Sequence, residues 1–391
     1  MAGITNAAYR QLCRESAEQG TAARPAGLFV CEMITSRGIV EGDPKTLSML
    51  QFDPGEQVRS VQLYGVDAAV MGRATAILCE QYAVGHVDLN FGCPVPKVTR
   101  KGGGAVLPWK RDRLRAILRA TVGAAAPFGV PVTMKTRIGI DASHLTYLDA
   151  GRIAEESGCA AIALHGRTAE QAYAGHADWD AIGSLKQSVD IPVLGNGDIW
   201  EAADAVRMVE QTGVDGVVVG RGCLGRPWLF RDLAAALSAL STERALSLSK
   251  GTGPGPSTEP VLSLSKGSGR IALPDLSEVA ATVRRHGELL AGIQGEEHGC
   301  KDLRKHMAWY FKGFPVGGEL RRSLAMVASL AELDDLLGRL PEAPFPDSEL
   351  GKPRGRQGSP RGRVVIPQGW LDDTSGLDLD LGDAELGISG G

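Results

Sequence analysis

The chain has 391 residues, of which 43% are hydrophobic and 23% charged, and its formal net charge is −4. This composition excludes a wholly disordered chain, and the length favours two domains or one large barrel with an appendage. No run approaches the roughly 20 apolar residues of a membrane span, and the seven cysteines include no C-x-x-C pair, which argues against a disulfide framework or a zinc knuckle. We therefore expect a soluble, monomeric, cytoplasmic protein without a metal.

Short apolar runs alternate with amphipathic helical segments from residue 5 to residue 237. Strands that are apolar on both sides and separated by helices indicate a parallel sheet built from βαβ units. The runs are GLFVCEM (27–33), VRSVQL (58–63), VDLN (87–90), VPVTMK (130–135), AAIALH (160–165), IPVLG (191–195) and GVVVG (216–220). We predict an α/β fold, a (β/α)8 TIM barrel over 1–244 with most of its first strand missing ahead of Met1.

The rest of the chain divides into three parts. Residues 245–270 contain LSLSKG twice around a Gly/Pro/Ser spacer, which indicates a low-complexity inserted loop. Helical spacing then returns and predicts a small all-helical domain at 271–345. Residues 346–391 combine the basic run KPRGRQGSPRGR with six acidic residues between Asp372 and Glu385, and we predict a disordered tail there.

Polar residues follow the carboxyl ends of six successive predicted strands, where a parallel barrel assembles its active site. A single Lys or His at such a position is usually a solvated or structural residue, but six strand ends in succession are hard to assign to chance. The residues are Gln62, Asn90, Cys93, Lys135, Arg137, His165, Arg167, Asn196, Gly197, Asp198, Gly220 and Arg221.

The loops after the last two predicted strands, GNGD and GRG, are candidates for binding phosphate. Loops at this place in a barrel present backbone N–H groups, and a following helix N-terminus adds positive potential. Arg221 can add a charge-assisted contact.

Cys93 lies in the sequence NFGCP, where Gly92 and Pro94 hold it in a constrained, non-helical turn. With an unperturbed pKa of about 8.5, a thiol is protonated at neutral pH and can donate a proton. Lys97 or Arg100 nearby could instead favour the thiolate and nucleophilic chemistry. The residues alone leave both roles open.

Two basic stretches are candidates for binding a polyanion. Residues 95–119 carry eight Lys and Arg against one acid, and the glycines beside Lys97 and Arg100 suit a loop that accommodates a polyanion. In KDLRKHMAWYFK, an apolar helical stripe indicates core, and Arg304 and Lys305 belong to a basic stripe that could track phosphates. A solvated helix face is the equal alternative for that stripe.

Taken in order, these motifs resemble those of the flavin-dependent tRNA-dihydrouridine synthases, most closely the bacterial B-type. The resemblance runs from residue 1 to about residue 340, with 245–270 as an insertion. The motifs are MAGITNAAYRQLC, VQLYG, DLNFGCPVPKV, VTMKTR, LHGRT, PVLGNGDI, VVVGRGCLGRPWLF and RKHMAWYFK.

The resemblance implies FMN bound across the barrel mouth and tRNA bound by the helical domain. NADPH, or NADH, would reduce the flavin, which would pass hydride to a uracil flipped out of the tRNA while Cys93 protonates carbon 5. Flavin contacts are expected from Met1, Ala2, Gln62, Lys135 and His165, and phosphate contacts from Asn196, Gly197, Asp198, Gly220 and Arg221. Substrate contacts are expected from Asn90, Lys97, Arg100, Arg137, Arg167, Arg304 and Lys305.

Two other functions are alternatives. A flavin barrel acting on free pyrimidines, of the dihydroorotate or dihydropyrimidine dehydrogenase type, has a similar N-x-x-C-P loop, but the basic run after Cys93 and the RKHMAWYFK motif argue against it. The third possibility is an inactive RNA-binding remnant that binds no flavin.

Overall fold

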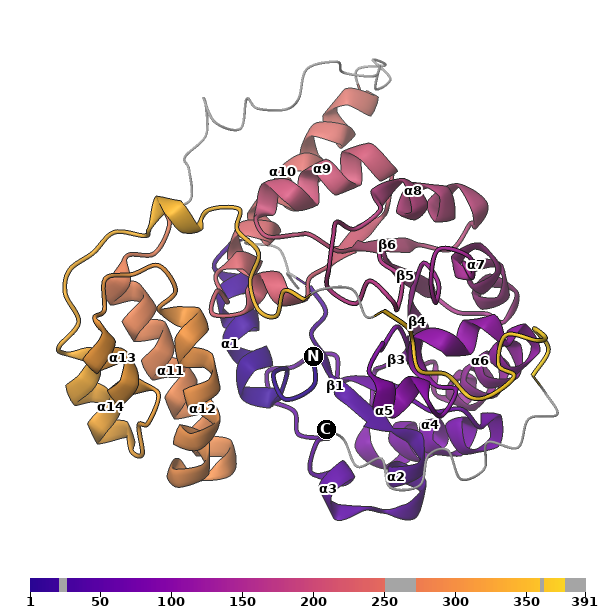
Figure 1. Ribbon diagram of the computed structural model, residues 1–391, viewed down its shortest axis with the longest axis horizontal. Coiled ribbons are helices and arrows are strands. Elements are labelled where there is room, and N and C mark those ends of the chain that lie inside the picture. The colour runs from indigo at the N-terminus through magenta and orange to yellow at the C-terminus, as the bar shows by residue number, and fades with distance from the viewer. Residues whose placement is uncertain (21–26, 250–271, 359–361, 377–391) are drawn as a thin grey trace.

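The computed structural model describes residues 1–20, 27–249, 272–358 and 362–376 (Figure 1). Its sheet has seven parallel strands in chain order, with helices between successive strands, which is the arrangement of a TIM barrel. Among the described residues no eighth strand joins β7 to β1. The strands are β1 (Val30–Thr35), β2 (Ser60–Tyr64), β3 (His86–Phe91), β4 (Val132–Arg137), β5 (Ala161–His165), β6 (Val193–Asn196) and β7 (Gly216–Val218).

Helices surround the sheet and bury the outer side chains of its strands. Leu63 of β2 and Leu89 of β3 are fully buried in one cluster with Leu78 of α4. Aspartate caps begin two of these helices: Asp67 accepts from the backbone of α4 and Asp178 from that of α8. The helices are α1 (Ala7–Glu18), α2 (Ser36–Glu41), α3 (Pro44–Leu47), α4 (Ala68–Tyr82), α5 (Pro96–Thr99), α6 (Arg111–Ala125), α7 (Tyr147–Glu156), α8 (Trp179–Ser188), α9 (Ala202–Thr212) and α10 (Leu229–Ser249).

The inner side of β2 and β3 is polar, whereas the sequence suggested strands that are apolar on both sides. Ser60 and Gln62 of β2 and Asp88 and Asn90 of β3 alternate with the buried apolar residues of the outer side. Gln62 lies beside Asp88 in the register, and Asn90 lies beside Lys135 of β4. The runs of β2 and β3 are apolar on average but alternate with period two, and that average hid their polar inner side.

Four further helices form a bundle beside the barrel, next to α1 (Figure 1). Tyr9 and Leu12 of α1 belong to the same buried hydrophobic cluster as Leu290 and Met307 of the bundle. The bundle therefore packs on the barrel through α1 rather than hanging from a linker. The four helices are α11 (Leu276–Gln294), α12 (Glu296–Tyr310), α13 (Gly318–Leu324) and α14 (Leu330–Leu337).

The predicted loop at 245–270 begins inside a helix. Helix α10 continues to Ser249, so residues 245–249 are helical, and the rest of the predicted loop lies outside the described residues. Within the part of the chain that the structure describes, no helix is both long and apolar enough to cross a bilayer.

The described parts of the tail that we expected to be disordered are packed against the barrel. We call the described residues between 346 and 376 the strap. Trp370 is only 1% exposed, and its Nε1 donates to the Val106 carbonyl over 3.1 Å. The buried Lys110 donates to the carbonyl and carboxylate of Asp373. The sequence-based expectation rested on charge, whereas the few apolar residues of this stretch supply the anchor; residues 377–391 lie outside the described residues.

Gly225→Ala tests the close approach of the barrel to the helical bundle. Gly225 has a φ of +65°, and a Cβ there would lie 2.3 Å from the carbonyl carbon of Trp309 in α12. The substitution should lower the free energy of unfolding by about 2–4 kcal/mol, from backbone strain and overpacking. Chemical denaturation measures this. Gly123→Ala, at an open position of α6, is the control and should not destabilise the protein; equal losses in the two variants would contradict the close approach.

Candidate functional site

The strand register gathers predicted residues from four neighbouring strands at the carboxyl edge of the sheet. Asn90 of β3 lies beside Lys135 of β4. Arg137, two residues further along β4, lies beside His165 of β5, which in turn lies beside Asn196 of β6. Residues that are far apart in the sequence thus form one row, which is the candidate site.

A continuous chain of hydrogen bonds leads from the inside of the sheet to Cys93. Its links are Ser60 Oγ to His86 Nδ1 (2.7 Å), His86 Nε2 to Thr133 Oγ1 (3.0 Å), Thr133 Oγ1 to Asp88 Oδ1 (2.7 Å), Gln62 Nε2 to Asp88 Oδ2 (2.6 Å), Asn90 Nδ2 to Gln62 Oε1 (2.8 Å) and Cys93 N to Asn90 Oδ1 (3.0 Å). Because the Thr133 hydroxyl donates to Asp88, it accepts from His86 Nε2–H. Burial lowers the pKa of His86, which favours the neutral imidazole, whose Nδ1 accepts from Ser60.

Four members of this chain, Ser60, His86, Asp88 and Thr133, were missed by the sequence analysis. Burial raises the pKa of Asp88, while hydrogen bonds from Gln62 and Thr133 act in the opposite direction. The signal was present in the sequence HVDLN, where His86, Asp88 and Asn90 take alternate positions and therefore one face of a strand.

The turn that carries Cys93 is held from three sides. The Asn90 side-chain oxygen accepts from the backbone N–H groups of both Gly92 and Cys93. Arg137 Nε donates to the Gly92 carbonyl over 2.8 Å, and the Cys93 carbonyl accepts from Ala105 N. The thiol is half-buried, so a rigid turn presents it at the end of the sheet.

Lys135 places an unpartnered cation in this row. The side chain is half-buried, and desolvation, followed by the charge of Arg137, lowers its pKa to about 7 while Asp88 acts to raise it. No hydrogen bond or ion pair joins its Nζ to another described residue. Since a desolvated ammonium without a partner is costly, the position favours an anionic or electron-rich ligand.

His165 is the neutral member of the row. Burial, with the neighbouring charges of Arg137 and Lys135, lowers its pKa well below the usual range. Its Nε2 lies 3.4 Å from Arg167 Nη1. Arg167 can only donate, so Nε2 accepts and the proton is on Nδ1. The imidazole can hydrogen-bond a ligand without adding charge.

The loop after β6 is shaped by the ion pair of Arg167 and Asp198. Arg167 Nη2 donates to both carboxylate oxygens of Asp198, over 2.7 and 2.9 Å. Arg167 also donates to the carbonyls of Ala174 and Gly175, so this guanidinium is tied within the protein. Gly197 has a φ of +122°, and a Cβ there would meet Ala177 at 2.6 Å, so only glycine fits this loop.

Arg221, after β7, lies over two aromatic rings. Its guanidinium carbon is 4.7 Å from the ring centre of Tyr173 and 5.1 Å from that of Trp200. Its Nη1 donates to the Arg356 carbonyl of the strap over 2.6 Å. The neighbouring Gly220 has open space where a Cβ would stand, so its backbone is accessible to a ligand.

The remaining predicted residues lie outside the row. Lys97 on α5 and Arg100 at its C-cap are exposed directly after the Cys93 turn, and Ala2 is exposed beside the half-buried Met1. In the bundle, Arg304 Nε donates to the Val327 carbonyl and Lys305 pairs with Asp302. Of these residues, only Lys97 and Arg100 follow the candidate thiol on the same loop.

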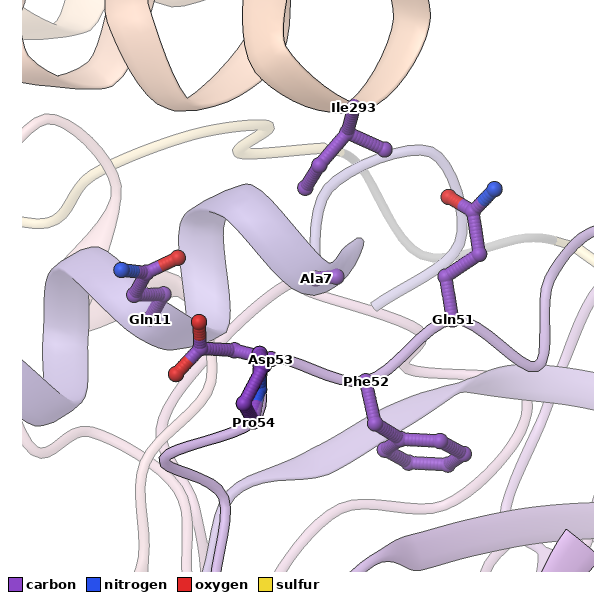
Figure 2. A pocket seen from close by; sticks show the side chains of 7 residues that line it. All are labelled: Ala7, Gln11, Gln51, Phe52, Asp53, Pro54 and Ile293. Carbon is purple, nitrogen blue, oxygen red and sulfur yellow. The ribbon is translucent and has the colours of Figure 1, made fainter.

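A pocket of about 270 Å³ lies between α1, the loop before β2 and the end of α11 (Figure 2). None of the residues of the row lines it, so it is not part of the candidate site. Within the described residues, no group of three or more His, Cys, Asp and Glu side chains is arranged to hold a metal. The lining residues are Ala7, Gln11, Gln51, Phe52, Asp53, Pro54 and Ile293.

Comparisons with known proteins agree with the motifs of the site. A family model described as "Dihydrouridine synthase (Dus)" matches residues 1–343. A probable tRNA-dihydrouridine synthase of Mycobacterium leprae is 49% identical over 100% of this chain and 99% of its own length. One of Mycobacterium tuberculosis is 50% identical over 100% and 93%. The tRNA-dihydrouridine synthase B of Pseudomonas putida is 34% identical over 82% and 83%, so the mycobacterial relatives are more similar to this chain than that B-type protein.

Lys135→Met tests the desolvated lysine. Its pKa is about 7 in the folded protein and about 10.5 when unfolded, so the unfolded chain binds more protons between these values and wild-type stability rises with pH in that window. Without added ligand, Lys135→Met should be more stable by roughly 2 kcal/mol at pH 7, a value reduced for the solvent that reaches the side chain.

The advantage of Lys135→Met should shrink as the pH approaches 10. Denaturant titrations of both proteins at pH 7, 8 and 9 measure it, with Lys45→Met, at an exposed position of α3, as the control for loss of a lysine. A difference that is independent of pH would contradict the lowered pKa of Lys135.

Proposed function

The chain belongs to the dihydrouridine synthase family and reduces uridines in tRNA to dihydrouridine, and we propose that it does so at the carboxyl edge of the sheet, with FMN as its cofactor and Cys93 as the proton donor. The observation that carries this proposal is the rigid Cys93 turn beside the unpartnered Lys135. The turn presents the Cys93 thiol as a proton donor, and the Lys135 ammonium favours an anionic or electron-rich ligand.

The residues of the site fit FMN. The acids closest to the row are already engaged, Asp88 by Gln62 and Thr133 and Asp198 by Arg167, so the charge of Lys135 is left for a ligand. Lys135 would stabilise negative charge on the reduced ring. Ring contacts are proposed for Gln62, Lys135 and His165, edge contacts for Met1 and Ala2, and phosphate contacts for Asn196, Gly197, Asp198, Gly220 and Arg221.

The reduction of a uracil needs one hydride and one proton. Bound FMN, reduced by NADPH or NADH, would supply the hydride for carbon 6. The chain supplies the proton: the Cys93 Sγ–H bond breaks, a C–H bond forms at carbon 5, and the resulting thiolate takes a proton from solvent. Charge and atoms then balance, and the thiol is regenerated.

Asn90 and Arg137 act on this step by positioning the thiol. Asn90 accepts from the Gly92 and Cys93 amides, and Arg137 holds the Gly92 carbonyl. Neither group needs to change charge for proton transfer. Asn90 was expected to hold the base; its Nδ2 is also engaged, donating to Gln62, so we assign its principal role to the turn.

The uridine must leave the RNA stack before it can reach the Cys93 turn. We propose that Lys97 on α5 and Arg100 at its C-cap, both exposed, contact the RNA backbone around the extruded nucleotide. Arg167, Arg304 and Lys305 are tied to partners within the protein and are weaker candidates for RNA contacts. A monomer acting in the cytoplasm is part of the same proposal.

Purified protein that is yellow and forms dihydrouridine in unmodified tRNA with NADPH would support this function. Colourless protein that cannot take up FMN would overturn the assignment of the cofactor.

Cys93→Ala should lower the rate of uridine reduction by about 10²- to 10⁴-fold, because the general acid is lost. NADPH should still bleach the bound flavin, since the proton donor to the base takes no part in that half of the reaction. Dihydrouridine content and anaerobic flavin absorbance measure the two steps. Cys79→Ala, on the outer helix α4, is the matched control and should retain both. If Cys93→Ala lost both steps equally, Cys93 would not be the proton donor.

A further inference from the structure

We propose that the strap is a second tRNA-binding element, in which the exposed cations Lys352, Arg356 and Arg363 contact phosphates of the RNA that reaches the carboxyl edge of the barrel. This inference rests on the proposed function, because it takes tRNA to be the substrate. The family model ends at residue 343, so the strap lies outside the matched family region, although the mycobacterial relatives align with the whole chain.

Buried anchors fix the course of the strap. Arg354 is 2% exposed and donates to the Trp309 carbonyl of α12 over 2.8 Å. Two residues later, the Arg356 carbonyl accepts from Arg221. Further along, Trp370 is buried on the segment that follows the Cys93 turn. The strap therefore leads from the helical bundle to the loops of the active site, as its path in Figure 1 shows.

The loops that the strap crosses all follow the carboxyl ends of strands. Trp370 and Val364 share a hydrophobic cluster with Val106, Ile140 and Ala169, which come after β3, β4 and β5. Arg221, at the other contact, comes after β7. A base that enters the site must pass this edge, so its flanking phosphates come close to the strap.

The charge of the middle of the strap suits RNA, whereas its two ends carry Asp347, Glu349, Asp372 and Asp373. Residues 350–371 contain five Lys and Arg and no Asp or Glu. Lys352, Arg356 and Arg363 are exposed, and no ion pair joins them to an acid among the residues that the structure describes. Basic residues of the helical bundle differ, because several are paired with acids: Lys301 with Glu297, Lys305 with Asp302 and Lys312 with Glu349.

Unpaired cations on an anchored backbone bind phosphates at low entropic cost and release counterions from the RNA. The anchors do not use the three side chains themselves: Arg356 contributes its backbone carbonyl, and the other anchors are Arg354 and Trp370. The cations can therefore be removed without breaking the strap. If the strap only braced the Cys93 loop, removing them would leave tRNA binding unchanged.

The test is the triple variant K352Q/R356Q/R363Q of the full chain. The affinity for unmodified tRNA is measured without NADPH at several salt concentrations. We expect a dissociation constant raised about tenfold or more near 0.1 M salt, and a slope of log Kd against log salt that is smaller by about 2. The control K45Q/R59Q/R73Q removes the same charge from exposed positions on the outer helices α3 and α4 and just before β2, and it should bind like wild type.

K352R/R356K/R363K keeps the charges and should restore wild-type binding, which separates loss of charge from damage to the strap. Equal binding by the glutamine variant and the control, or an unchanged salt slope, would overturn the inference. Wild-type protein that binds tRNA but reduces no uridine with FMN and NADPH would instead contradict the proposed function. The binding comparison between the variants would still test the strap.

Discussion

The site depends on one buried carboxylate, Asp88, whose lost hydration must be replaced by protein groups. Thr133 and Gln62 each donate to one of its oxygens, and this fixes which way both side chains point. Because the Gln62 side-chain N–H donates to Asp88, its side-chain oxygen accepts from Asn90 Nδ2. The Asn90 side-chain oxygen then accepts from the backbone N–H of Cys93. A charge buried inside the sheet thus sets the orientation of a thiol at its edge.

The two faces of the strands therefore do different work. Outer residues such as Leu63 and Leu89 are apolar and pack against the surrounding helices. On the inner side of β2 and β3, the polar residues Ser60, Gln62, Asp88 and Asn90 each have a hydrogen-bond partner. Lys135 of β4 has none among the described residues, and burial lowers its pKa, which is why we propose that a ligand binds beside it.

Sequence patterns singled out many residues of the candidate site but not their hydrogen-bond partners. Cys93, Lys135 and His165 stood out because they follow predicted strands, and the register does bring their strand ends together. Arg137 and Arg167 looked the same by that criterion, yet both donate to backbone carbonyls, because guanidinium groups buried at a loop base must find acceptors. Asp88 and Thr133 were not predicted as site residues because a single polar residue within an apolar run does not change the strand prediction.

By itself, the sequence determined the order of strands and helices, the barrel class and the family, and it singled out Cys93 as a candidate, because each depends on local periodicity or on a short motif. Only the tertiary structure decided that the inside of the sheet is a hydrogen-bonded chain, that the bundle packs on α1, and that the charged tail is anchored by Trp370. These depend on contacts between residues far apart in the chain, and their free energy comes from burial that no local pattern records.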